Sequence, residues 1–175
     1  MPAGNKTENP LTMRDIRDED FDFIYEIYSD PGVNRAMNYP AGQKEDFQRI
    51  FSELKGRTYF WCFEHKELGP VGMASFVAGF GRMVHSGMIG TVNVHPDYQG
   101  RGFGKAQMYL IIDFLKDKGY TRLHLNALAD NVAAIGLYRS LGFHEDGFMP
   151  AFWQREYEDN PVGAYLFSLT FPGQG

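Results

Sequence analysis

The chain is poor in cysteine and in long apolar runs, and each shortage excludes a class of protein. Cys62 is the only cysteine among 175 residues, so no disulfide can form within the chain and a reducing compartment is expected. No apolar stretch reaches the roughly 20 residues that cross a bilayer. Residues 1–10 lack the basic and apolar regions of a signal peptide. We therefore expect a cytoplasmic protein with no membrane partner.

The chain also has few positive charges and no histidine with a second possible metal ligand at a suitable spacing. Lys and Arg number 17 against 22 Asp and Glu, a formal net charge of −5. Such a chain supplies no positive field for a phosphate backbone, so we expect no nucleic-acid partner. None of the five histidines is followed by a second ligand three or four residues later. We therefore predict no metal site.

Length and composition indicate an ordinary globular chain. One domain over residues 1–175 is expected, with residues 1–9 mobile. Apolar spacing predicts helices over residues 21–30, 43–54, 103–118 and 130–141. Apolar and aromatic runs predict strands over residues 11–16, 58–64, 71–80, 88–94, 123–128, 143–149 and 163–171. This order predicts an α/β (α+β) fold with a mixed, mostly antiparallel central sheet of about seven strands and helices on both faces.

A glycine-rich turn, Gln99–Gly104, follows the predicted strand 88–94 and leads directly into a helix. Its three glycines keep side chains away, so successive backbone N–H groups can face one anion. The first N–H groups of the helix and its positive dipole end add to that site. Arg101 and Lys105 would supply further charge. The turn therefore predicts a binding site for phosphate groups.

Three kinds of phosphate site share this design, and spacing separates them. A Walker A loop needs Ser or Thr after Gly-Lys, but Gly104-Lys105 is followed by Ala106. A dinucleotide fingerprint needs a third glycine, where this chain has Gln107, and an acidic residue after the next strand, which is missing. The pattern that remains is Gln-x-x-Gly-x-Gly.

This pattern resembles the acetyl-CoA loop of the GNAT superfamily of N-acetyltransferases, where Gln or Arg, then Gly, then Gly or Ala stand at the same spacing. Residues 92–98 resemble the family's fourth strand and its exit, and residues 130–143 resemble its last helix and the strand after it. The resemblance is strong over roughly residues 88–146. It implies a GNAT-like fold and transfer of an acetyl group from acetyl-CoA to a primary amine, without a metal.

The resemblance also implies which residues hold acetyl-CoA. The loop would bind the pyrophosphate, and the strand before it would bind the pantetheine arm. The implied set is Val92, Asn93, Val94, Gln99, Gly100, Arg101, Gly102, Phe103, Gly104, Lys105, Asn126, Asn131, Ala134 and Tyr138. Asp130 is predicted to cap the last helix, and Asn131 fits a capping role as well as a cofactor contact.

Acetyl transfer needs a proton donor for the departing thiolate. The family has a tyrosine near the CoA sulfur at the position of Tyr138, so the resemblance implies Tyr138 as the general acid. Its place on an apolar stripe with Ala134 and Leu141 also fits a core residue.

The general base is harder to assign. Many relatives carry a glutamate on the fourth strand, and residues 88–94 contain none. His85, just before that strand, is the first choice, because a histidine titrates near neutral pH. A surface role for His85, a role for His95 or Glu145 as base, and a chain of waters stay open.

The acceptor is expected to be a small molecule with a primary amine. Residues 82–85 are weakly similar to small-molecule acetyltransferases, which favours an amino acid, antibiotic or polyamine. The alternatives are a peptide N-terminus, or a non-catalytic acyl-CoA-binding module. A homodimer through C-terminal strands is also expected. The acceptor should lie among the N-terminal helices, Asn38-Tyr39, Phe80–His85, Trp153 and Tyr157.

Overall fold

A seven-stranded mixed sheet forms the centre of the molecule, in the order β1-β2-β3-β4-β5-β7-β6. The structure is a computed structural model that describes residues 9–37, 42–156 and 158–172. Every neighbouring pair is antiparallel except β4 and β5, so the predicted mixed, mostly antiparallel sheet is confirmed. The strands are β1 (Leu11–Asp15), β2 (Tyr59–His65), β3 (Gly69–Ala78), β4 (Ser86–Val94), β5 (Arg122–Leu128), β6 (His144–Trp153) and β7 (Val162–Thr170).

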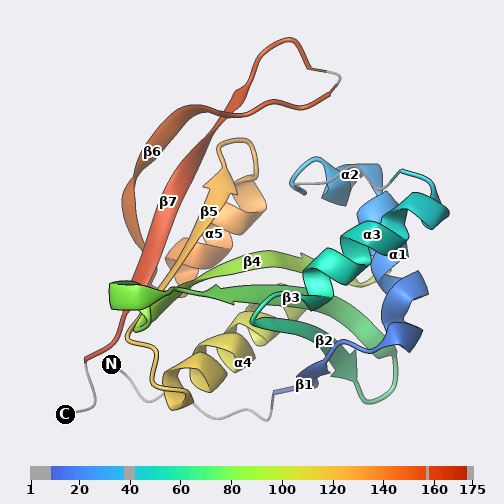
Figure 1. Cartoon of the computed structure of the whole chain (residues 1–175), viewed down its shortest axis with the longest axis horizontal. Coiled ribbons are helices and arrows are strands. Elements are labelled where there is room, and N and C mark those ends of the chain that lie inside the picture. Colours follow the sequence, from blue (N-terminus) through green and yellow to red (C-terminus); the bar gives the residue numbers. More distant parts are fainter. Residues whose placement is uncertain (1–8, 38–41, 157, 173–175) are drawn as a thin grey trace.

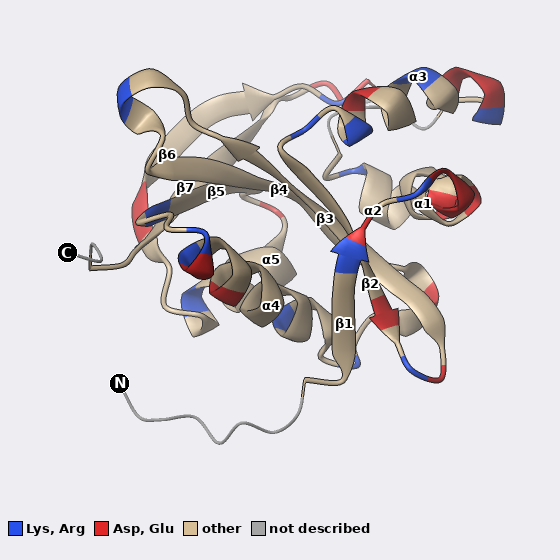
Figure 2. Ribbon diagram, turned by 60° about the horizontal axis from the view of Figure 1, so that its bottom comes forward, with Lys and Arg blue, Asp and Glu red and all other residues tan. Residues whose placement is uncertain are grey.

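Helices cover both faces of the sheet, as predicted (Figures 1 and 2). They are α1 (Phe21–Ser29), α2 (Pro31–Asn34), α3 (Lys44–Lys55), α4 (Phe103–Asp117) and α5 (Val132–Ser140). The first three share one core with Phe60 and Met73, while α4 and α5 share the other with Trp61. Adjacent residues of β2 thus serve opposite cores, because side chains alternate along a strand. Among the described residues, no helix has the length and apolar content needed to cross a membrane.

The spacing of apolar residues explains how α3 forms and packs. Phe47, Ile50, Phe51 and Leu54 recur at intervals of three and four residues and are all buried, while the residues between them are exposed. Gly56 follows at the C-terminal cap and donates its N–H back into the last turn. The chain then enters β2, and α3 packs on the face of the sheet that carries Phe60 and Met73.

β4 and β5 are parallel neighbours that pair only where they begin. Backbone pairing joins Ser86–Met88 to Arg122–His124, although β4 continues to Val94 and β5 to Leu128. On their other sides, β3 follows β4 to its end and β7 follows the whole of β5. The two halves of the sheet therefore separate beyond Met88, and Figure 1 shows β5 turning away from β4.

A bulge interrupts β4 where the strands have separated. Ser75 pairs with Gly90, and Met73 pairs with Asn93. One residue of β3 between these pairs therefore lies opposite two residues of β4, so β4 carries one extra residue. Thr91, in the bulge, has a φ of 49°, in the left-handed region that a β-branched residue rarely adopts. Such a backbone costs about 1–3 kcal/mol, so surrounding contacts must hold it in place.

Two segments are more regular than the sequence indicated. Pro31 ends α1 as predicted, but it also begins α2, because proline fits the first helical position and Asp30 accepts a hydrogen bond from the Val33 N–H at 2.8 Å. β6 continues to Trp153, beyond its predicted end at residue 149. Both segments border the cleft between the separated strands.

The predicted cap of α5 is wrong. Asn131, not Asp130, is the capping residue, and its Oδ1 accepts a hydrogen bond from the Ala134 N–H at 3.1 Å. Asp130 lies one residue before the capping position, and its carboxylate instead accepts two hydrogen bonds from Arg155. The alternative reading of Asn131 as a helix cap is thus confirmed.

Candidate active site

The glycine turn forms a row of free backbone donors. Gly100 and Gly102 have φ values of 75° and 82°, which only glycine adopts without strain. These angles turn the chain so that α4 starts immediately after Gly102. The backbone N–H groups of residues 100–104 donate to no described residue. Five successive free donors at a helix N-terminus make a binding site for an anion such as pyrophosphate.

Neighbouring side chains hold the turn in this shape. Phe103 is buried and its ring lies 5.5 Å from that of His65. Gln99 donates from Nε2 to the Val94 carbonyl at 3.2 Å, which joins the end of β4 to the turn. The turn is therefore anchored at both ends before any ligand binds.

Two predicted cofactor residues lie outside the cavities. Arg101 donates to the Asp97 carbonyl at 3.2 Å and stands over the Tyr98 ring, 5.5 Å from its centroid. Lys105 is exposed beside the Tyr109 ring. Neither side chain lines a cavity described below, so the backbone rather than these two cations carries the anion site in this structure.

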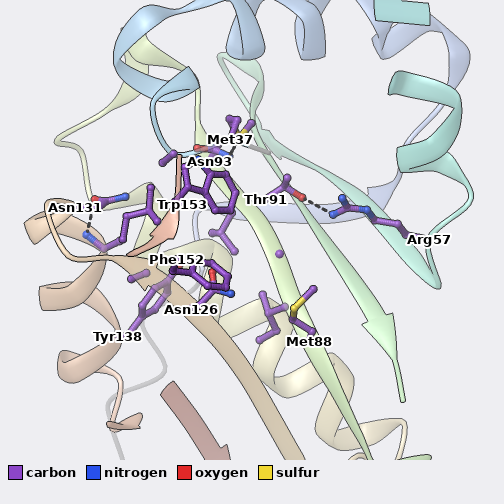
Figure 3. A pocket seen from close by; sticks show the side chains of 17 residues that line it. Met37, Arg57, Met88, Thr91, Asn93, Asn126, Asn131, Tyr138, Phe152 and Trp153 are labelled. Atoms are coloured by element: carbon purple, nitrogen blue, oxygen red, sulfur yellow. Dashed lines mark hydrogen bonds between the residues drawn. The ribbon is translucent and has the colours of Figure 1, made fainter. Parts of the chain in front are cut away.

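Two cavities meet in the opening between β4 and β5. The first, of about 440 Å³, contains the glycine turn, Val92–Val94 and part of α5, and we call it the cofactor cavity. The second, of about 310 Å³, extends along β4 and β5 towards α3 and the end of β6, and we call it the acceptor cavity (Figure 3). The residues shared by both are Ala36, Val92, Asn93, Asn131, Ala134 and Tyr138.

Tyr138 stands at the junction of these cavities. Its side chain comes from α5, is 7% exposed, and contacts the rings of Phe143 and Phe167. No described residue forms a hydrogen bond with its hydroxyl. Burial raises the pKa of Tyr138 to about 12. The phenol therefore keeps its proton at neutral pH and has it free to donate.

Three asparagines bring polar groups to the same junction. Asn131 caps α5 with Oδ1, so its amide nitrogen is left for other contacts. Asn93 donates from Nδ2 to the Met37 sulfur at 3.3 Å, and its carbonyl accepts from Gln107 at 3.3 Å. Asn126, on β5, lines only the acceptor cavity. The structure thus brings together twelve of the fourteen predicted cofactor residues, all except Arg101 and Lys105, although Asn126 lies on the acceptor side.

His85 is not among the residues brought together. It is exposed, precedes the first residue of β4, and lines neither cavity. At about 3.3 Å per strand residue, it lies about 20 Å from Val92 along β4. The His85 carbonyl accepts a hydrogen bond from the Thr121 N–H at 2.8 Å, which fixes the backbone at the start of β4. We therefore assign His85 no part in proton transfer.

The other candidate bases also lie elsewhere. The His95 ring stacks on Phe23, and Glu145 pairs with Arg139 at 2.6 Å. Neither lines a cavity. The only carboxylate among the described residues that line either cavity is that of Asp30, which is used as the cap of α2. Among the described residues no group of three His, Cys, Asp or Glu lies together as a metal site would require.

Sequence reasoning missed the side chains that hold the β4 bulge. Arg57 donates from Nη1 to Ser75 Oγ at 2.5 Å and to Thr91 Oγ1 at 3.3 Å. Ser75 is fully buried, lies 2.6 Å from Thr91 Oγ1, and donates to the Gly90 carbonyl at 3.1 Å. Nothing in the sequence signals this cluster, because its members come from three separate segments. It compensates the strained backbone of Thr91.

An ion-pair cluster lies at the rim of the cavities, where Arg35 and Asp130 directly precede the lining residues Ala36 and Asn131. Arg155, only 11% exposed, pairs with Asp130 at 2.8 Å and Glu158 at 2.9 Å, and donates to the Arg35 carbonyl at 2.9 Å. Arg35 in turn pairs with the same two carboxylates. The β6–β7 hairpin is therefore tied both to the start of α5 and to the segment after α2.

Only some of the segments expected around the acceptor line the acceptor cavity. Met37 and Trp153 line the acceptor cavity, whereas Phe80–His85 does not. Asn38, Tyr39 and Tyr157 lie outside the described residues.

Comparison with known proteins agrees with this geometry. A sequence model of the "Acetyltransferase (GNAT) family" matches residues 21–143, which include β4, the glycine turn and α5. The chain belongs to the GNAT acetyltransferase family.

Individual GNAT proteins are similar over part of the chain or in fold. The ribosomal protein bS18-alanine N-acetyltransferase of Escherichia coli is 48% identical over 54 residues, which are 31% of this chain and 36% of that protein. The match thus spans about a third of the length of this curated relative.

Two solved structures show the shared fold. A GNAT-family acetyltransferase from Bacillus anthracis has a TM-score of 0.77 at 18% identity, covering 92% of this chain and 95% of that one. Spermidine N-acetyltransferase from Vibrio cholerae, solved with CoA and spermine, has a TM-score of 0.79 at 15% identity, with the same coverage of each chain.

The rim cluster leads to a stability prediction. Arg155→Met should lower the free energy of unfolding by about 1–2 kcal/mol, because charge-assisted hydrogen bonds to two carboxylates and a carbonyl are lost. Arg139→Met removes the more exposed pair with Glu145 and should cost less than about 1 kcal/mol. Chemical denaturation of both variants measures the difference, and equal losses would contradict a special role for the rim.

The same pair should respond to acid. Hydrogen bonding from Arg155 lowers the pKa of Asp130. The stabilisation from this pair should therefore be present above about pH 4 and disappear as the pH falls through the lowered pKa. The difference between Arg155→Met and wild type should shrink over that range, and a constant difference would show that the pair is not its source.

Proposed function

We propose that the protein transfers an acetyl group from acetyl-CoA to the primary amine of a small-molecule acceptor, by direct attack, with Tyr138 as the general acid. The observation that carries the proposal is the junction of the two cavities at Tyr138. One cavity contains the row of free N–H donors and the other leads away from it along β4. Two substrates that enter from opposite sides would meet at this hydroxyl.

The cofactor cavity offers backbone donors for a pyrophosphate and space between α5 and β4 for an extended arm. A Cβ built on Gly104 would lie 3.7 Å from Leu137 and 3.8 Å from Val94, so a larger side chain there would fill the space between α5 and β4. The turn would bind the pyrophosphate, and the backbone of Val92–Val94 would hold the pantetheine arm, because this edge of β4 pairs with no described strand. When bound, acetyl-CoA would supply a reactive thioester, and the Val94 N–H would stabilise charge developing on its carbonyl oxygen.

Tyr138 would supply the proton that the departing sulfur needs. A phenol with a pKa of about 12 is roughly 3.5 units above a free thiol, which corresponds to about 5 kcal/mol for complete transfer in water. Burial raises the pKa of Tyr138 and would also raise the pKa of a thiol beside it, so the difference between the two pKa values would be smaller in the protein. A hydrogen bond from Tyr138 Oη to the sulfur would stabilise the developing charge before the proton moves.

A chain of waters is the proposed route for the proton of the amine. An amine with a pKa near 10.4 is neutral in about one molecule in a thousand at pH 7.4. The candidate histidines and Glu145 lie outside the cavities, and the Asp30 carboxylate is used as a helix cap. The polar groups of Asn93, Asn126 and Asn131 can order waters between the amine and solvent.

Two alternative functions would require different properties of the protein. A non-catalytic acyl-CoA-binding module would bind CoA without releasing thiol in the presence of amines, and the free hydroxyl of Tyr138 argues against it. A peptide N-terminal acetyltransferase is favoured by the similarity to the bS18-alanine enzyme. That reading requires an open path for a polypeptide, whereas the rim cluster around Arg155 ties the cleft edges together.

We also propose a cytoplasmic location and a homodimer. The thiol of Cys62 is buried, and burial raises its pKa to about 12, so it is unreactive and suited to a reducing compartment. β6 lies at the edge of the sheet and exposes Phe148. Pairing of two such edges would satisfy their free backbone groups.

Gly104→Glu tests the cofactor site. The new carboxylate would occupy the cofactor cavity beside the anion site, so the affinity for acetyl-CoA should fall by about 100-fold or more. Gly136→Glu is the matched control, because Gly136 is exposed on α5 and a Cβ there meets no atom within 4 Å. Calorimetry that finds equal affinity in both variants would contradict the assignment.

Tyr138→Phe tests the general acid. Only the hydroxyl is removed, so acetyl-CoA binding should survive while kcat falls by about 100-fold or more. Tyr165→Phe is the control, since Tyr165 contacts Phe148 and Phe167 but lines neither cavity. Wild-type turnover by Tyr138→Phe would make Tyr138 a core residue without a catalytic role.

A further inference from the structure

The acceptor cavity has an unusual charge. Among the described residues that line it, Arg57 is the only one with a charged side chain. A polyamine or aminoglycoside carries several ammonium groups and would need carboxylates to replace their hydration. No Asp or Glu among the described lining residues supplies one. The cavity therefore disfavours a polycation.

Arg57 has donors left over after it holds the bulge. Its Nη1 serves Ser75 and Thr91, and no described carboxylate pairs with the guanidinium. The remaining N–H groups donate to no described residue. A guanidinium fixed through one nitrogen presents the others in a planar fork, which matches the two oxygens of a carboxylate.

Neighbouring charges do not cancel the field of Arg57. The rim cluster contains two arginines, Arg35 and Arg155, and two carboxylates, Asp130 and Glu158, which pair with one another. This cluster is neutral as a whole. Among the described residues that line the acceptor cavity, the positive charge of Arg57 is thus left uncompensated.

The rest of the cavity suits the body of a small amine. Phe152 and Trp153 from β6 reach it from one side, Met37 and Met88 add apolar surface, and Arg57 approaches from the other side beside Thr91 (Figure 3). Thr91 is only one residue before Val92, which lies at the junction with the cofactor cavity. An acidic group at Arg57 would therefore leave a nearby amine within reach of the junction.

We propose that the acceptor is an amino acid or a similar amine that carries an acidic group, and that Arg57 binds this group. The inference rests on the proposed acetyltransferase function and narrows its substrate class. Arg57 then has two roles, because it holds the bulge through Nη1 and selects the acceptor through its other donors. The reaction joins the amine nitrogen to the acetyl carbon, breaks the carbon–sulfur bond, and yields the N-acetyl acid and free CoA thiol.

The test compares acids with their neutral analogues. Thiol release from acetyl-CoA is measured with each of the α-amino acids, with its α-amide, and with spermidine. At least one amino acid should exceed its amide in kcat/KM by about 10- to 100-fold, the range expected for a hydrogen-bonded charge pair. An amide or spermidine as the best acceptor would overturn the inference and leave the transferase function intact. No thiol release with any acceptor would contradict the transferase function itself.

Variants assign the preference to Arg57. Arg57→Gln removes the charge and shortens the side chain, so kcat/KM should fall by a larger factor for the acid than for the amide. Arg49→Gln removes the same charge from an exposed position on α3 and should leave both values unchanged. An equal loss for acid and amide in Arg57→Gln would show a purely structural role and overturn the inference. The wild-type comparison decides the substrate class even if Arg57→Gln fails to fold.

Discussion

The incomplete pairing of β4 with β5 is the constraint on which the rest of the site depends. After Met88 and His124 the two strands part, although each keeps its antiparallel neighbour on the other side. A continuous sheet would fill this space with a ladder of backbone hydrogen bonds. The divergence leaves one edge of β4 free, places α5 beside it, and creates the two cavities that meet at Tyr138.

Electrostatic contacts then give the two sides of the opening different properties. Backbone donors of residues 100–104 make the cofactor side a site for an anion without using a charged side chain. On the acceptor side, Arg57 supports the strained Thr91 and supplies the only charge among the described lining residues. The cluster around Arg155 links the rim across the gap and adds no net charge. Cofactor binding and linkage of the rim are thus carried by separate groups, whereas Arg57 both supports the bulge and lines the acceptor cavity.

Local patterns predicted most of the elements, because helices and turns here are set by nearby residues. The glycine turn and α4 follow from Gln99–Gly104, and α3 follows from its apolar spacing. The bulge was not predictable, since Thr91 adopts a backbone that its own side chain disfavours and that distant partners stabilise. The distance of His85 from both cavities was not predictable, because sequence proximity to β4 does not tell which end of the strand borders them.

A crystal structure with bound acetyl-CoA tests the central claim most directly. The pyrophosphate should accept hydrogen bonds from the N–H groups of residues 100–104, and the pantetheine arm should lie between β4 and β5. The sulfur should then lie within hydrogen-bonding reach of Tyr138 Oη, beside the acceptor cavity that Arg57 lines. A cofactor bound outside this opening, or a sulfur remote from Tyr138, would contradict the account.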